Sequence, residues 1–303
     1  MNPTVRVDQI NLALLGFSFV VAWLVPFELL LFSYAFLGPL HYLTEISWLH
    51  DRKYFTLLPE DPWYLIAGSL FLLYSGVALF PSAAELVWIL LLLAFCTAFV
   101  RSLWKRLFIL AGGIVLLVPW MGSSLSYAGA LLIPTIAHVY LFTILFMWFG
   151  ALKSKSKLGH YNAALFLLGG VALLLLPGAR EYLWPEFLGA DRILVDGILV
   201  AFSSILAVSM DTLLTTIAPF LAFVYTYHYL NWFSKTSIIE WHQVSWQRAM
   251  LIGCLYAVAV GVYLIDYQTG FIVLLSLSFL HVVLEFPLNF KSIVGIYSSL
   301  RKS

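Results

Sequence analysis

The sequence predicts an all-α integral membrane protein, a transmembrane helical bundle of about ten spans, with eight to eleven as the range. Of its 303 residues, 62% are hydrophobic and only 10% are charged, and the mean hydropathy is +0.97. A soluble domain runs near half apolar and a quarter charged, so it could not bury this much apolar surface. Isolated histidines inside the apolar runs are the third observation, because ionisable side chains are rare within membranes.

The span positions follow from the rule that about 20 apolar residues cross a bilayer. Prolines at positions 26, 81 and 177 separate or close the runs, since proline breaks the hydrogen-bond ladder of a helix. No small-residue cleavage site follows the first run, which is therefore read as a retained span. The expected spans are 9–25, 27–48, 61–80, 84–100, 104–121, 126–149, 160–177, 211–233, 247–265 and 270–288.

The charges of the loops predict which side of the membrane each loop and each terminus faces. Loops rich in Lys and Arg alternate with loops around residues 82, 123 and 268 that carry neither. Positive loops stay in the cytoplasm, so an even number of spans with both termini cytoplasmic is expected. The positive clusters are Arg52/Lys53, Arg101/Lys105/Arg106, Lys153/Lys155/Lys157, Lys235/Arg248 and Lys291/Arg301/Lys302.

Residues 193–208 are apolar but interrupted by Asp196 and Gly197, and a full span there would break the charge alternation. This segment is therefore expected to be a re-entrant or interfacial helix. With no internal repeat, residues 1–303 are predicted to form one integral membrane domain. The net charge of +1 excludes a basic face for nucleic acid, which leaves membrane lipids as the expected surroundings.

Four histidines carry the functional prediction: His41, His138, His228 and His281. In the predicted topology their spans all run from outside to inside, and all four lie at a similar depth, in the middle to cytoplasmic half of the bilayer. The remaining histidines at positions 50, 160 and 242 fall in cytoplasmic loops, where a solvated role is expected.

Neutral imidazole binds iron, copper or zinc without adding charge to the membrane interior. The four histidines are therefore predicted to hold one Fe(II) with open positions for O2 or water, and Zn is the alternative metal. Glu45 and Glu285 follow His41 and His281 by four residues, on the same helix face. They are expected to accept the second imidazole N–H. The competing interpretation is that each histidine only hydrogen-bonds a neighbouring helix.

These elements resemble, in order, the motifs of the Brp/Blh family of membrane β-carotene 15,15'-dioxygenases of archaea and bacteria. The matching pieces are Pro39-Leu40-His41 with Glu45, Ile136-Ala137-His138, Tyr227-His228, and Leu280-His281 with Glu285. Two departures stand out: Trp232 occupies the position where the family has the second histidine of an HxxxH pair, and no acid follows His138. About forty extra residues also separate His41 from His138.

The resemblance implies an iron-dependent oxygenase in a prokaryotic plasma membrane. Such an enzyme would take a carotenoid or similar lipophilic substrate from the bilayer and cleave it with O2 to form retinal. Glu45 and Glu285 would tune ligands there instead of attacking substrate.

Other functions stay open at this point. Intramembrane His and Glu residues also build proton- or ion-coupled transporters, although no inverted repeat is visible. A membrane di-iron desaturase needs around eight clustered histidines, more than the seven scattered ones in this chain. A zinc-dependent intramembrane hydrolase would use the same kind of ligands.

Overall fold

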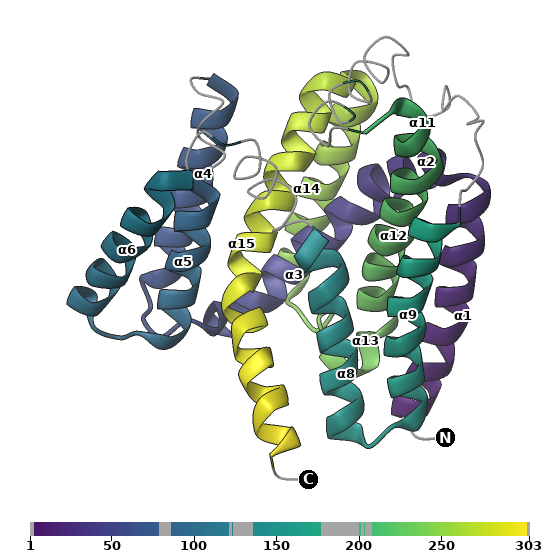
Figure 1. Cartoon of the computed structure of the whole chain (residues 1–303), viewed down its shortest axis with the longest axis horizontal. Helices are drawn as coiled ribbons and strands as arrows, with labels where there is room; N and C mark the ends of the chain where they lie inside the picture. The colour runs from purple at the N-terminus through teal and green to yellow at the C-terminus, as the bar shows by residue number, and fades with distance from the viewer. Residues whose placement is uncertain are drawn as a thin grey trace. The chain divides into compact units, whose positions relative to one another are not determined.

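A computed structural model describes residues 3–78, 86–120, 123, 136–176, 200, 203 and 208–301 of the chain. All regular structure in this part of the chain is helical, which confirms the all-α prediction (Figure 1). Apart from residues 200, 203 and 208, the predicted re-entrant segment at 193–208 lies outside the described residues, as does the start of the predicted span at 126.

Among the described residues, eight stretches of helix are long and apolar enough to cross a membrane. They match eight of the ten predicted spans, and the total span number and the side of the termini stay predictions. Helix α4 (Asp61–Ala78) and helix α5 (Leu86–Phe99) correspond to the two further predicted spans. The eight stretches are Thr4–Leu24, Pro26–Asp51, Leu103–Trp120, Ala137–Ser154, Lys157–Leu175, Met210–Ser234, Trp246–Ile265 and Tyr267–Leu300.

The chain divides into two compact units, each built from separate stretches of sequence. Unit 1 comprises residues 1–44 and 139–275, and unit 2 comprises residues 45–138 and 276–303. Each point where the chain passes from one unit to the other lies in a helical segment that carries one of the four histidines. The prediction of one domain stays a prediction.

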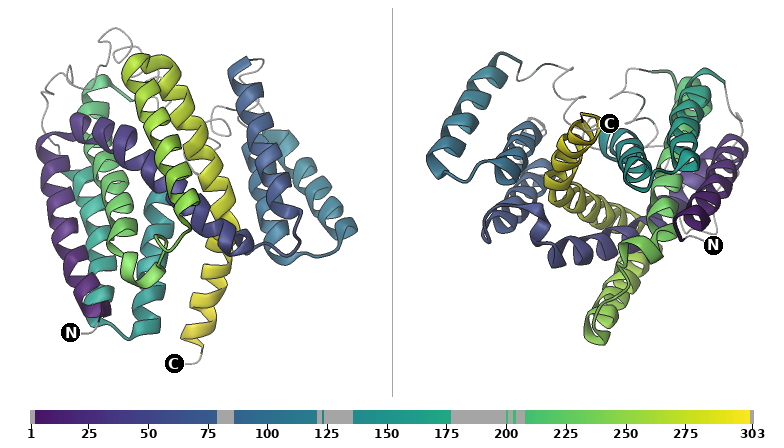
Figure 2. Two further views of the ribbon diagram at one scale, coloured as in Figure 1. Left: turned by 180° about the vertical axis from the view of Figure 1, so that it is seen from behind. Right: turned by 90° about the horizontal axis from the view of Figure 1, so that it is seen from below.

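Unit 1 is organised around α12 (Ala218–Ser234), which packs against α1 (Pro3–Leu24), α2 (Pro26–Phe32) and α9 (Lys157–Leu175). Figure 1 and Figure 2 show α1, α9 and α12 running side by side. About two-thirds of the most apolar part of Met210–Ser234, the stretch that contains α12, is buried. Aromatic rings pack around α12. Because other helices pack around α12, most of its polar side chains are buried.

The remaining helices of unit 1 frame this centre. The helix α8 (Thr143–Ser154) packs on α9, and the short α11 (Met210–Thr212) and α13 (Thr236–Ile239) flank α12. Most of the surface of α14 (Trp246–Ile265) is exposed and apolar, as expected of a helix that faces lipid.

A tight turn joins α14 to α15 (Tyr267–Leu300). The carboxylate of Asp266 accepts hydrogen bonds from the backbone N–H of Gln268 and the hydroxyl of Thr269. These bonds hold the pKa of Asp266 below its usual value, chiefly through Thr269. Gly270 is required next, since an added Cβ would lie 2.1 Å from the Cα of Tyr263.

In unit 2, α5 packs against α4 and against α6 (Leu103–Leu117), which continues into the short 3₁₀ turn η4 (Val118–Trp120). Figure 2 shows these three helices grouped together. Asp61 at the start of α4 forms a bidentate ion pair with Arg106 of α6, and both side chains are buried. Another 3₁₀ turn, η2 (Lys53–Phe55), follows α3 (Gly38–Asp51).

Three π-helical turns interrupt the helices that carry His41, His138 and His228. They are η1 (Ser33–Leu37), η5 (Ala137–Phe142) and η7 (Leu213–Ile217). After η1 and η7 the next backbone N–H bonds five residues back, from Gly38 to Ser33 and from Ala218 to Leu213. In both cases the residue after that is a proline, which lacks the N–H that an uninterrupted α-helix would need.

Candidate metal centre

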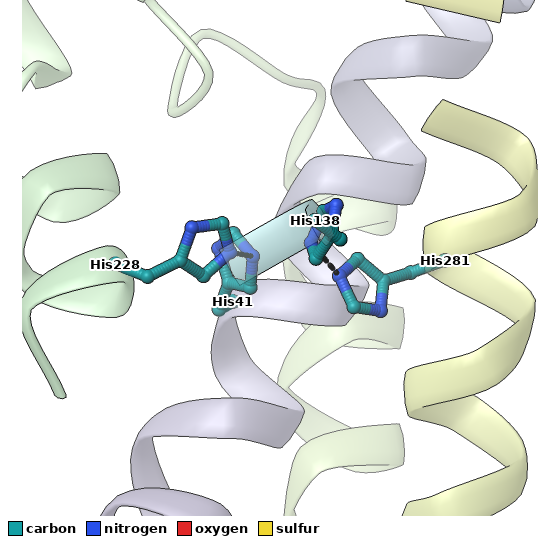
Figure 3. A group of neighbouring side chains, drawn as sticks. All are labelled: His41, His138, His228 and His281. Carbon is teal, nitrogen blue, oxygen red and sulfur yellow. Dashed lines mark hydrogen bonds between the residues drawn. The ribbon is translucent and has the colours of Figure 1, made fainter. Parts of the chain in front are cut away.

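All four predicted histidines are buried, with exposed fractions of 1% for His41, His138 and His281 and 8% for His228. They form two facing pairs, one in each unit (Figure 3). Of the three other histidines, His50 and His242 are exposed, whereas His160 is half-buried on α9 and not in a loop; their solvated roles stay predictions.

The first pair lies in unit 1, between α3 and α12. Nε2 of His41 and Nε2 of His228 are 3.0 Å apart, and the two rings are nearly perpendicular. The hydroxyl of Thr143, on α8, lies 2.7 Å from Nδ1 of His228. When that Nδ1 carries the proton and donates to Thr143, Nε2 presents its lone pair.

Aromatic side chains enclose His41. The rings of Tyr229, Trp232 and Tyr42 have their centroids 5.1, 5.5 and 5.7 Å from the imidazole centroid. The phenol oxygens of Tyr42 and Tyr229 are 2.5 Å apart, and both side chains are completely buried. This enclosure keeps water from the first pair and gives it apolar walls.

Trp232 occupies the position of the missing HxxxH partner and has a defined contact. Its indole N–H donates to the hydroxyl of Thr44 at 3.0 Å, and Thr44 donates to the backbone carbonyls of Leu40 and His41. Trp232 therefore ties α12 to the turn of α3 that carries His41. The sequence alone indicated neither this contact nor the one between Thr143 and His228. In each case the two partners lie far apart along the chain.

The second pair lies in unit 2. Nε2 of His138, in η5, is 3.1 Å from Nε2 of His281, on α15. Nδ1 of His138 lies 3.0 Å from a carboxylate oxygen of Glu285. Glu285 thus contacts the histidine of another helical segment and not only His281, one turn before it on α15.

Glu45 belongs to the same unit as the second pair. One carboxylate oxygen of Glu45, one of Glu285 and one ring nitrogen of His281 all lie within 4.8 Å of one another. The two carboxyl groups are therefore neighbours, although they come from different helices, α3 and α15. The two predicted acids are therefore together, and their role toward the histidines stays a prediction.

The pair geometry can be compared with that of a metal site. Two nitrogens held about 2.1 Å from one ion are roughly 3.0 Å apart at a right angle and roughly 3.4 Å apart at a tetrahedral angle. The separations of 3.0 and 3.1 Å fall within this range, and they also suit a direct hydrogen bond between the rings. Four buried histidines could hold a metal ion.

Comparison of the chain with protein-family models, with curated proteins and with solved structures finds no match. The chemistry of the site therefore has to be argued from its own residues.

Proposed function

We propose that the chain is a membrane-embedded oxygenase in which His41, His138, His228 and His281 together hold one Fe(II). The facing Nε2 atoms of the two pairs are the observation that carries this proposal. Each pair supplies two nitrogen ligands at a separation that fits one cation. The similar depth of the four histidines in the predicted spans supports a single set of ligands.

Neighbouring side chains orient the rings of the histidines. The hydroxyl of Thr143 lies 2.7 Å from Nδ1 of His228, and a carboxylate oxygen of Glu285 lies 3.0 Å from Nδ1 of His138. These neighbours favour a proton on each Nδ1, which leaves the Nε2 lone pair of one histidine in each pair available. Neutral imidazoles add no charge of their own, and the carboxylate of Glu285 beside His138 would supply negative charge that partly offsets a dication in the membrane.

The surroundings of His41 support an apolar substrate. The proposed substrate is a carotenoid or similar apolar isoprenoid that enters from the bilayer, because the walls around His41 are aromatic and dry. Bound Fe(II) would supply O2 activation for cleavage of a conjugated double bond, while the protein positions the substrate and excludes water. The resemblance to the Brp/Blh family favours β-carotene as substrate and retinal as product.

Expression in cells that produce β-carotene tests this proposal, with retinal measured by chromatography. The wild-type chain is expected to form retinal, and His41→Ala is expected to reduce it to the background level. His160→Ala, a half-buried histidine on α9, serves as the matched control and should retain activity. Unchanged β-carotene with no cleavage product from the wild-type chain would contradict the proposal.

A proton-coupled transporter is the second candidate. It is favoured by the neighbouring buried carboxyl groups of Glu45 and Glu285, since buried carboxyl groups are common in proton pathways through membranes. The two functions differ in their need for metal. Transport would survive complete removal of metal by a chelator, whereas the oxygenase would lose its activity.

A further inference from the structure

Unit 2 contains a second group of ligand atoms besides its histidine pair. Glu45 on α3 joins Glu285 and His281 on α15, and one ligand atom from each lies within 4.8 Å of the other two. All three side chains are buried, with exposed fractions of 3%, 2% and 1%. His281 and Glu285 are four residues apart and share a face of their helix.

The charge of this group needs compensation. Two ionised carboxylates inside a membrane are costly, because burial removes the water that stabilises each negative charge. A divalent cation bound between the two carboxylates would neutralise both charges.

We propose that Glu45, Glu285 and His281 form a second divalent-cation site, separate from the four-histidine site. His281 is shared: Nε2 faces His138, and the other ring nitrogen serves the second cation. Two carboxylate oxygens and one imidazole nitrogen are typical ligands for Mn²⁺ or Fe²⁺. This site goes beyond the proposed function, because it needs neither His41 nor His228.

Titration with MnCl2 tests the site on the full-length chain, purified in detergent and stripped of metal. Free Mn²⁺ is counted by electron paramagnetic resonance. The wild-type chain is expected to bind one Mn²⁺ through the carboxylates, and Glu45→Gln/Glu285→Gln to bind it at least about tenfold more weakly. His41→Ala/His228→Ala is expected to keep the wild-type affinity.

Glu28→Gln is the matched control, because it removes a buried carboxylate from α2, in unit 1. It should leave Mn²⁺ binding unchanged. The single variant Glu45→Gln repeats the test with less disturbance, and a symmetric elution profile establishes that each variant is folded.

The outcomes are distinct. Mn²⁺ binding that is absent from the wild-type chain, or that is unaffected by the Glu45 and Glu285 substitutions, would overturn the second site. Binding that depends on the carboxylates but not on His41 or His228 supports it. That result would hold even if the chain forms no retinal, so failure of the oxygenase proposal is measured separately.

Discussion

The hydroxyl of Thr143 lies 2.7 Å from Nδ1 of His228, on the opposite edge of the ring from His41. Nothing in the sequence around Thr143 marks it, because its role depends on the packing of α8 near α12. The acids at His41+4 and His281+4 could be found because helical periodicity is local. Contacts through space, such as those of Thr143, Trp232 and Glu285, could not.

Substitution of Thr143 by Val is expected to weaken metal binding about tenfold, because it removes the partner that orients His228. Metal bound per chain, measured over a concentration series, checks this. Thr226→Val is the matched control: Thr226 is also buried in unit 1, but its hydroxyl bonds Ser33 at 2.6 Å. Equal losses in both variants would point to general destabilisation.

Lys235, which follows α12, shows a residue-scale effect outside the spans. Desolvation lowers its pKa from the ordinary 10.5 to about 8, and the charge of Asp8 opposes part of that shift. Between pH 8 and 10.5 the unfolded chain binds more protons at this lysine than the folded chain does, so stability should rise with pH in that window.

Melting temperatures in detergent test this effect. The wild-type chain should be less stable than Lys235→Met at pH 7.5, and the gap should narrow by a few degrees at pH 10. Lys157→Met, at an exposed lysine in the first turn of α9, is the control. A gap that does not change with pH would argue against the burial effect.

At the scale of elements, the chain's helices were predictable and their π-helical turns were not. Long apolar runs determine where helices form, and prolines indicate where they bend. Whether a proline produces a kink or a π-helical turn depends on which carbonyl the next free N–H reaches. The turns η1 and η7 precede Pro39 and Pro219, and the sequence showed only those prolines.

The ion pair between Asp61 and Arg106 holds α4 to α6. Arg106 also donates to the carbonyl of Val100 at 2.6 Å, and the backbone N–H of Leu58 donates to Asp61 at 3.0 Å. Arg106→Met should destabilise the protein by about 3–5 kcal/mol, because it leaves a buried carboxylate without its counter-charge.

Thermal unfolding in detergent measures this loss. Asp61→Leu/Arg106→Met is expected to recover most of the stability, since no charge then remains buried. Arg52→Met, which removes only an exposed guanidinium over the Trp48 ring, should cost less than about 1 kcal/mol. A double variant as unstable as Arg106→Met would contradict the charge argument.

At the scale of the whole molecule, composition predicted a helical membrane protein, and eight helices in the described part of the chain meet the length and hydropathy that a span requires. The four histidines that the sequence places at a similar depth in the predicted spans are all buried. Their arrangement as two pairs was not predictable, because depth along a span does not define which helices are neighbours. The division into two units was not predictable from the sequence either, since each unit is assembled from two stretches that are far apart along the chain.

The central claim is that both histidine pairs bind the same iron, and the iron content of purified variants tests it most directly. His41→Ala affects the pair in unit 1 and His138→Ala the pair in unit 2. Each substitution is expected to remove one equivalent of iron per chain, and the double variant no more than either single one. A wild-type chain without iron, or losses that add in the double variant, would contradict a shared four-histidine site.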